Sequence, residues 1–228
     1  MISVVLAAYK GEKYIEAQVR SILPQLGKDD ELIVSDDFPQ GKTRQMLEPL
    51  MDSDSRIVYL QGPGKGVIKN FEYGITMAKG DCIFLADQDD VWLENKVETV
   101  VREIENGADL VLHNALITDG ELNETGETSF EVNRTTTGIL RNVVKNSYQG
   151  CCMAFHRDLV RFILPFPERL PMHDQWIGLM AEKHGKVKLV KEPLILYRRH
   201  AENVSGNGSS PGDKIKWRLS IISSLIGR

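Results

Sequence analysis

The feature that most constrains this chain is an apolar run that ends at three carboxylates. Residues 82–86 are all apolar, and Asp87, Asp89 and Asp90 follow within four positions. Such a run is typical of a strand buried on both faces of a parallel sheet. In open α/β sheets, ligands bind beyond the carboxyl ends of the strands. We therefore expect the three carboxylates to lie at a functional site.

Carboxylates packed this closely repel one another and raise one another's pKa unless a cation offsets their charge. Their oxygen atoms are the ligands that Mg²⁺ and Mn²⁺ prefer. The structural alternative is that they cap a helix beginning near Leu93, since Asp is favoured at helix N-termini. A single Asp would be enough for a cap, so the cluster favours a metal site.

Apolar runs alternate with amphipathic segments in the first half of the chain, which predicts βαβ units and a parallel sheet with helices on both faces. The predicted strands are 2–7, 31–35, 56–60, 81–86 and 109–113, and the predicted helices are 13–23, 42–51, 66–78 and 94–105. A second region should complete the sheet from the other side. It comprises an apolar stretch at 148–155, a short helix from Asp158, a proline-rich turn at 165–171, a helix at 174–184 and a strand at 187–196.

Three segments have a different composition. The polar stretch from Thr118 to Thr137 is predicted to be a loop or flap that orders around a ligand. Residues 205–212 are rich in Gly and Ser, which is typical of a flexible linker. Residues 214–228 predict a short basic amphipathic helix. That helix would either lie on an anionic membrane or pack on the protein or a partner subunit.

Composition limits the class of function. The 228 residues, 42% of them hydrophobic, are sufficient for the core of one globular domain. A net charge of −4 disfavours wholesale nucleic-acid binding, which needs a broad basic face. The three cysteines form neither a disulfide framework nor a zinc motif, and the first apolar run is too short for a signal peptide. These features predict a cytoplasmic protein.

Other polar residues are placed to face the same edge of the sheet. Tyr9 and Asp37 follow the first two predicted strands, so a base could stack on Tyr9 while the carboxylate accepts its ring N–H. A turn with a packing Tyr is the alternative. Lys65 and Asn70 lie near the start of a helix after a glycine-rich turn at 62–66. Both residues could contact a nucleotide there, although the turn does not match the P-loop pattern. Plain solvation is the alternative.

Two residues in the second region are candidates for chemistry. Asp174 opens a predicted helix, so it is either an N-cap or a carboxylate placed to act as a general base. His200 follows the last predicted strand, and an imidazole could complete a Mn²⁺ site with an Asp. The alternative for His200 is an ordinary surface histidine.

In their order and spacing, these motifs resemble the family 2 glycosyltransferases of the GT-A fold, over the chain up to about His200. The Asp-Gln-Asp-Asp-Val-Trp run at 87–92 is most similar to bacterial enzymes, including rhamnosyltransferase-like ones, that build surface polysaccharides. The resemblance implies a single α/β domain with a mostly parallel, Rossmann-like sheet. Residues 1–114 would form its nucleotide-sugar-binding half and 115–203 its acceptor-binding and catalytic half. Residues 204–228 would be a linker and C-terminal helix.

The resemblance also implies residue roles on a UDP- or dTDP-linked sugar donor. Tyr9 and Asp37 would hold the nucleobase and Asp87 the ribose. Asp89 matches the second Asp of the family's DXD motif and would bind Mn²⁺ or Mg²⁺, with His200 as a further ligand. Asp174 matches the general base that activates a hydroxyl of a saccharide or lipid-linked acceptor.

One departure concerns the nucleobase side. The family usually has Gly-Ser-x-Asp after the Asp pair, whereas residues 38–41 here are Phe, Pro, Gln and Gly.

A single base suits one in-line displacement, which predicts inversion at the anomeric carbon. The alternatives are an inactive nucleotide-sugar-binding module and a sugar-phosphate nucleotidyltransferase. The latter would need a glycine-rich signature near the first strand, which residues 7–11 do not supply.

Overall fold

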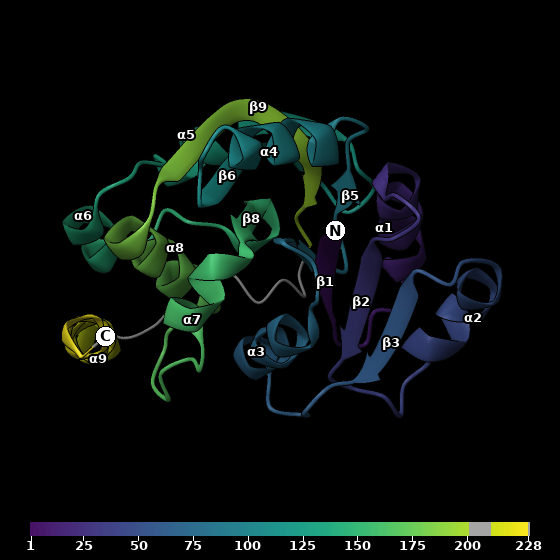
Figure 1. The fold of residues 1–228 in the computed structure, drawn as a ribbon, viewed down its shortest axis with the longest axis horizontal. Helices are drawn as coiled ribbons and strands as arrows, with labels where there is room; N and C mark the ends of the chain where they lie inside the picture. The colour runs from purple at the N-terminus through teal and green to yellow at the C-terminus, as the bar shows by residue number, and fades with distance from the viewer. Residues whose placement is uncertain (201–210, 228) are drawn as a thin grey trace.

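The computed structural model describes residues 1–200 and 211–227, and one mixed sheet runs through the molecule (Figure 1). The strand order is β3-β2-β1-β4-β8-β6-β9-β5, with β7 paired to β6. The strands are β1 (Ile2–Ala8), β2 (Glu31–Asp36), β3 (Ile57–Gln61), β4 (Cys82–Asp87), β5 (Val91–Trp92), β6 (Leu110–Thr118), β7 (Glu124–Thr128), β8 (Met153–His156) and β9 (Val187–Arg198).

The first four strands of that order are parallel, as the sequence predicted. Helix α3 (Val67–Met77) covers one face of them, and α1 (Ile15–Ile22) and α2 (Thr43–Ser53) cover the other (Figure 1). Gly74 allows the close approach of α3, because a Cβ there would lie 2.5 Å from Cγ1 of Val5. Packing on both faces explains why β1 and β4 are almost continuously apolar.

The second half of the chain extends the sheet in an order that the sequence did not reveal. Strand β8 lies between β4 and β6 and is antiparallel to both. Strand β9 then pairs with β6 in parallel, and the short β5 pairs with β9. Six strands therefore share one direction while β5, β7 and β8 run the opposite way, which makes the sheet mostly parallel. Helix α4 (Lys96–Glu105) packs on β6, β8 and β9.

The prediction of a loop or flap between Thr118 and Thr137 was wrong for its middle part. Strand β7 pairs with the end of β6, and helix α5 (Ser129–Asn133) follows it directly. The Glu131 carboxylate accepts a hydrogen bond from the backbone N–H of Thr128, which is the reciprocal arm of a capping box. The polar residues that suggested a loop are the exposed side of an edge strand and a helix cap.

The remaining helices lie beyond β7 in the chain: α6 (Ile139–Val144), α7 (Val160–Ile163), α8 (His173–His184) and α9 (Pro211–Ile226). The predicted C-terminal helix is confirmed as α9, which begins at Pro211. Most of the predicted linker, residues 205–210, lies outside the described residues. Within the described residues, no helix combines the length and apolarity needed to cross a membrane.

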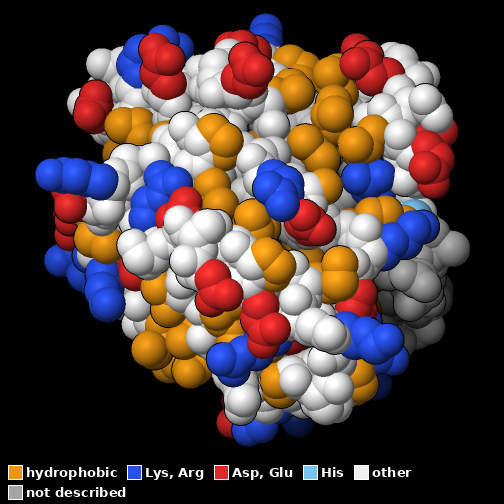
Figure 2. Space-filling view, turned by 90° about the vertical axis from the view of Figure 1, so that its right-hand side faces the viewer, with side chains coloured by type: hydrophobic (Ala, Val, Ile, Leu, Met, Phe, Trp, Pro, Cys, Tyr) orange, Lys and Arg blue, Asp and Glu red, His pale blue; other side chains and the backbone are white. Residues whose placement is uncertain are grey.

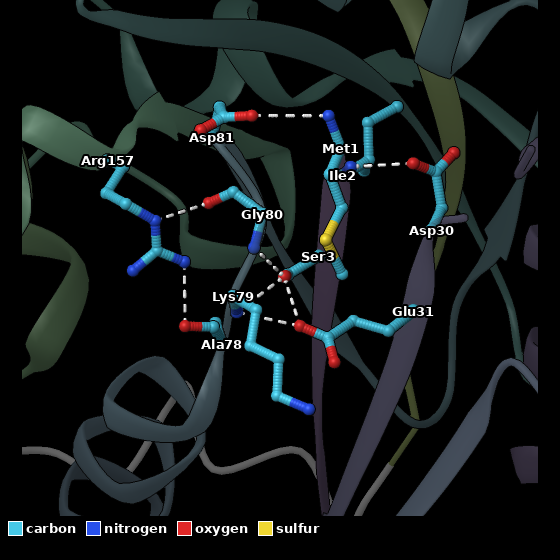
Figure 3. A network of polar contacts seen from close by, with 10 residues as sticks. All are labelled: Met1, Ile2, Ser3, Asp30, Glu31, Ala78, Lys79, Gly80, Asp81 and Arg157. Atoms are coloured by element: carbon cyan, nitrogen blue, oxygen red, sulfur yellow. Dashed lines mark hydrogen bonds and ion pairs between the residues drawn. The ribbon is translucent and has the colours of Figure 1, made fainter.

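A polar network fixes the amino ends of the central strands, at the end of the sheet opposite the three carboxylates (Figure 3). The Ser3 hydroxyl donates to Glu31 at 2.6 Å and accepts from the backbone of Gly80 at 2.7 Å. Arg157 donates to the carbonyl oxygens of Gly80 and Ala78, both at 2.7 Å. These bonds tie β1, β2, the turn before β4 and the residue after β8 together.

The outer face around α2 and β3 carries a mixture of charged and apolar side chains. Figure 2 shows acidic and basic side chains interspersed over it, with apolar groups between them. Such a mixture is typical of a soluble surface.

Candidate active site

Most of the predicted site residues line one pocket of about 1070 Å³ at the carboxyl ends of β1, β2 and β4. Strand register explains the convergence: Ala7 is paired with Asp87 and Ala8 with Asp36, so the segments that follow these strands meet at one edge. The predicted residues that line the pocket are Tyr9, Asp37, Asn70, Asp87, Asp89, Asp174 and His200. Lys65 is not among the lining residues and lies in an exposed turn between two that are, Gly64 and Gly66.

Asp37 organises the glycine-rich turn. Its Oδ1 accepts from the backbone N–H of Gly64 and its Oδ2 from that of Gly66, both at 2.7 Å. Both glycines have positive φ, at +65° and +85°, which favours glycine at these two positions. The carboxylate and the turn, which the sequence suggested as separate features, therefore form one unit.

The side-chain amide of Asn70 forms hydrogen bonds within the fold. Its Nδ2 donates to the carbonyl of Ser35 at 2.8 Å, and its Oδ1 accepts from the Ser35 hydroxyl at 2.6 Å. The side chain is buried and links α3 to the end of β2. Asn70 thus lines the pocket while its amide holds the edge of the sheet.

Tyr9 presents an aromatic ring at the mouth of the pocket. The residue is 54% exposed, and its ring meets Phe38 edge to face with 5.6 Å between centroids. Gln88 holds its backbone: Oε1 accepts from the Tyr9 N–H at 2.8 Å and Nε2 donates to the Tyr9 carbonyl at 3.0 Å. Gln88 was not predicted as a site residue. It fixes the loop after β1 to the loop after β4.

The carboxylates after β4 lie in a poorly solvated position. Burial, followed by the charges of Asp89 and Asp174, raises the pKa of Asp87 to about 7. Burial, followed by the charges of Asp89 and Asp87, also raises the pKa of Asp90 well above its usual range. The Oδ1 of Asp90 accepts from the Arg198 N–H at 3.1 Å, but its Oδ2 has no hydrogen-bond partner among the described residues. Such a cluster would be stabilised by a cation.

Asp89 and His200 form the best candidate for a divalent cation site. The Nε2 of His200 lies 2.7 Å from Oδ2 of Asp89, and each side chain is 13% exposed. Arg198 donates from Nε to the Asp89 carbonyl at 2.7 Å, which fixes the loop to the end of β9. A carboxylate oxygen and an imidazole nitrogen fit Mn²⁺. The structure brings the two residues together, and their role as metal ligands stays a prediction.

A second acidic group lies deeper in the fold. Ligand atoms of Asp87, Asp90 and Cys151 lie within 4.8 Å of one another. A hydrogen bond with Cys152, followed by burial, raises the pKa of the Cys151 thiol well above its usual range. Cysteine sulfur suits softer metals than Mg²⁺ or Mn²⁺, whereas a carboxylate and an imidazole suit Mn²⁺, so we favour the Asp89 and His200 pair.

Asp174 faces the pocket from the first turn of α8. Its Oδ1 accepts from the Asn146 amide at 3.0 Å and from the Gln175 N–H at 2.6 Å. Burial outweighs these hydrogen bonds and raises the pKa of Asp174 to about 7. A carboxylate with this pKa suits proton abstraction near neutral pH. The contact with Gln175 is also what a helix-capping Asp would make.

Two buried cationic or imidazole side chains beside the site were not predicted. His173 is stacked on Phe71 with 4.1 Å between ring centroids, and burial lowers the pKa of the imidazole to about 3. Lys96 is fully buried; its Nζ donates to the Cys151 carbonyl at 3.0 Å and lies 3.9 Å from the Trp92 ring centroid. Burial lowers the pKa of Lys96 to about 8. Only the neighbouring Asp174 signals His173 in the sequence, and nothing signals Lys96.

Comparison with known proteins gives a family match. The family model "Glycosyl transferase family 2" matches residues 3–164. An uncharacterized glycosyltransferase of Nostoc sp. is 24% identical over 212 residues, which cover 89% of this chain and 66% of the relative. The dTDP-rhamnosyl transferase RfbG of Shigella flexneri is 24% identical over 239 residues, covering 95% of this chain and 78% of the relative.

A third relative matches a shorter stretch of the chain. It is the UDP-Glc:alpha-D-GlcNAc-diphosphoundecaprenol beta-1,3-glucosyltransferase WfgD of Escherichia coli, 34% identical over 99 residues. The match covers 43% of this chain and 38% of that protein. The chain thus spans just under two thirds of the Nostoc relative and much less of the Escherichia coli one.

Solved structures show the same fold. TarS 1–349 of Staphylococcus aureus in complex with UDP-GlcNAc has a TM-score of 0.77 at 20% identity, covering 99% of this chain and 66% of that chain. Glucosyl-3-phosphoglycerate synthase of Mycobacterium tuberculosis, in complex with Mn²⁺, UDP and phosphoglyceric acid, has a TM-score of 0.62 at 21% identity. That match covers 100% of this chain and 78% of the other. The predicted GT-A fold is confirmed.

Proposed function

Because this chain belongs to glycosyl transferase family 2, we propose that it transfers a sugar from a UDP- or dTDP-linked donor to a hydroxyl of a saccharide or lipid-linked acceptor, with inversion. The observation that carries the proposal is one pocket lined by Asp89 and His200 and also by Asp174. A candidate cation site and a candidate base thus share a single space. That combination suits displacement of a nucleoside diphosphate.

The donor would bind along the carboxyl ends of β1, β2 and β4. The exposed ring of Tyr9 is available for stacking on a base, and Asp37 holds the turn at 62–66 through two backbone bonds. We assign the ribose to Asp87, with Asn70 supporting the wall of the pocket. Carboxylate acceptors of this kind recognise ring N–H and hydroxyl groups.

Asp89 and His200 would hold Mn²⁺ or Mg²⁺. A bound ion would offset the negative charge that develops on the leaving nucleoside diphosphate. The Mn²⁺ in the Mycobacterium tuberculosis structure supports a divalent ion in this fold. Arg198 donates a hydrogen bond to the Asp89 carbonyl and so holds the loop that carries Asp89 near His200.

Asp174 would remove the proton from the attacking acceptor hydroxyl. One base is sufficient for a single in-line displacement, and such a displacement inverts the anomeric carbon. Asn146 and the Gln175 N–H hold one carboxylate oxygen in place. The raised pKa of Asp174 matches the requirement for a base near neutral pH.

The class of acceptor is inferred from the names of the relatives. One of them is named for a diphosphoundecaprenol acceptor, which supports a lipid-linked acceptor in bacterial surface-polysaccharide synthesis. An enzyme acting on such an acceptor would work at the cytoplasmic face of the membrane.

A thermal-shift titration tests the donor site. UDP, dTDP, GDP and CDP are each added with and without Mn²⁺ to the wild type, Asp89→Ala and the exposed control Asp52→Ala. Ligand at a hundredfold its Kd should add about 2.7 kcal/mol, which corresponds to a melting shift of roughly 5–10 °C in a domain of this size. We expect a shift with UDP or dTDP that requires both Mn²⁺ and Asp89. No shift with any nucleotide would contradict the proposed donor site.

A further inference from the structure

Exposed apolar side chains are concentrated on two helices far from the nucleotide side of the pocket. Twelve large apolar side chains are exposed in the described part of the chain, and six of them lie on α6 and α9. We refer to five of these as the docking face: Leu140, Val144, Leu219, Ile222 and Ile226. Isolated exposed apolar residues are ordinary, whereas a cluster of this kind marks an interaction site.

Helix α9 is attached to the body of the protein by its opposite side. Ile221 and Leu225 are buried, and the Leu225 carbonyl accepts from Nζ of Lys183 at 2.6 Å. At 100° per residue, Leu219, Ile222 and Ile226 fall within about 60° of one another on the outward side. Their exposed fractions are 62%, 41% and 80%. The helix therefore has a second apolar stripe that the described residues leave uncovered.

The two helices present one continuous surface. Arg218 donates from Nη2 and Nε to the Val144 carbonyl, at 2.6 and 3.2 Å, which joins α9 to the end of α6. Val144 is 60% exposed, and Leu140, one turn earlier on the same face of α6, is 83% exposed. Figure 1 shows α6 and α9 together at one end of the molecule, next to α8.

The charge of this surface is opposite to that of the whole protein. Among the residues of α6 and α9 whose side chains the structure describes, together with Lys145 at the end of α6, four are basic, Arg141, Lys145, Lys216 and Arg218, and none is acidic. The chain as a whole has a net charge of −4. Apolar side chains flanked by Lys and Arg suit the interface of an anionic bilayer.

We propose that the docking face binds an anionic phospholipid membrane. The surface also leads directly to the proposed base, because Asn146, which donates to Asp174, comes two residues after Val144. Membrane contact would thus hold the acceptor side of the pocket near the bilayer. This last consequence rests on the proposed function, whereas binding to lipid does not.

Vesicle co-sedimentation of the full chain without substrate tests the proposal. Vesicles of phosphatidylcholine alone are compared with vesicles in which about a third of the lipid is phosphatidylglycerol, because an anionic surface attracts basic residues. An apolar variant, Leu219→Ser with Ile222→Ser and Ile226→Ser, is compared with a matched variant on other faces, Met46→Ser with Val58→Ser and Met77→Ser. All six positions are exposed. Circular dichroism and nucleotide thermal shifts check that each variant is folded.

A charge-reversal pair separates the electrostatic contribution. Arg141→Glu with Lys145→Glu and Lys216→Glu is compared with Lys28→Glu, Lys79→Glu and Lys186→Glu, all exposed. Each basic residue near an anionic surface contributes about fivefold to the partition coefficient. We expect the first charge variant to lose roughly a hundredfold in binding, and the control to lose less than threefold.

The expected result is salt-sensitive binding to the anionic vesicles that both docking-face variants lose and both controls retain. Equal binding to neutral vesicles, or no binding, would overturn the proposal. So would a concentration-dependent dimer in analytical ultracentrifugation that the apolar variant abolishes, because the face would then join two copies of the chain. Since nucleotide shifts are measured on the same samples, loss of donor binding is distinguished from loss of membrane binding.

Discussion

Nε2 of His200 lies 2.7 Å from Oδ2 of Asp89, although 111 residues separate the two along the chain. The contact brings the end of β9 against the loop after β4. A metal-dependent mechanism for this chain would depend on this contact.

Replacing His200 with Ala should weaken Mn²⁺ binding. Loss of even an outer partner of a metal site typically costs about 10–100-fold in affinity, so loss of a ligand should cost at least as much. Calorimetric titration of Mn²⁺ in the presence of UDP measures the effect. His156→Ala, outside the pocket, is the control, and unchanged Mn²⁺ affinity in the His200 variant would remove His200 from the site.

Replacing Asp174 with Asn should lower kcat while leaving nucleotide binding intact. Loss of a general base costs about 10²–10⁴-fold in rate. Sugar release and transfer are measured beside the UDP thermal shift, with Asp158→Asn as an exposed control. A variant that retains near wild-type kcat would show that Asp174 only caps α8.

The pH dependence of kcat/KM should report the same carboxylate. The pKa of Asp174 is raised to about 7 by burial, and a base must be ionised to act. The rate should therefore be level above about pH 7 and fall about tenfold per unit below it. Profiles at two Mn²⁺ concentrations provide a control, since a limb that moves with metal concentration belongs to a metal ligand. A limb that lies well below pH 6 would contradict the assignment.

Replacing Asp37 with Asn should weaken nucleotide binding. One of the two backbone N–H groups, of Gly64 or Gly66, would then face an amide NH₂ in place of an oxygen. Leaving such a donor unsatisfied costs about 1–3 kcal/mol, which corresponds to roughly 5–150-fold in Kd if the turn must be reformed on binding. Isothermal titration with UDP measures it. Asp52→Asn should leave the affinity as it is, and equal values for both variants would mean that the turn plays no part in donor binding.

Replacing Gly74 with Ala should destabilise the fold. The added methyl would lie 2.5 Å from Cγ1 of Val5, in the contact between α3 and β1. Overpacking of this kind typically costs about 1–3 kcal/mol. Urea denaturation measures the change, with Gly120→Ala as the control because no atom lies within 4 Å of a Cβ there. Equal stability would mean that α3 shifts freely on the sheet.

The local parts of the fold could be predicted from the sequence, while strand order beyond β4 could not. Buried apolar runs identify β1, β2 and β4, and their carboxyl ends place Tyr9, Asp37 and Asp89 at one edge. Placement of β8 between β4 and β6 depends on pairing between distant segments, and a run such as 153–156 has no signal for its neighbours. The same limit explains why Lys96, an ordinary charged residue in the sequence, was not expected beneath the site.

The segment 124–133 shows another limit. Its alternating polar residues match an exposed edge strand as well as a loop, and only pairing with β6 distinguishes the two. The proximity of Asp89 and His200 was suggested by resemblance to a family. Their separation in the sequence would not have predicted it, because contacts across 111 residues are set by the whole topology.

The position of β8 has a consequence for how the chain is made. Strands β4 and β6 are both complete by residue 118, yet the strand that pairs between them ends at residue 156. During synthesis, the inner edges of β4 and β6 would remain unpaired until some forty further residues have emerged. Unpaired edges of apolar strands are sites of mispairing. A nascent or truncated chain that stops before β8 should therefore require chaperone protection, whereas one that includes β8 can pair both of these edges.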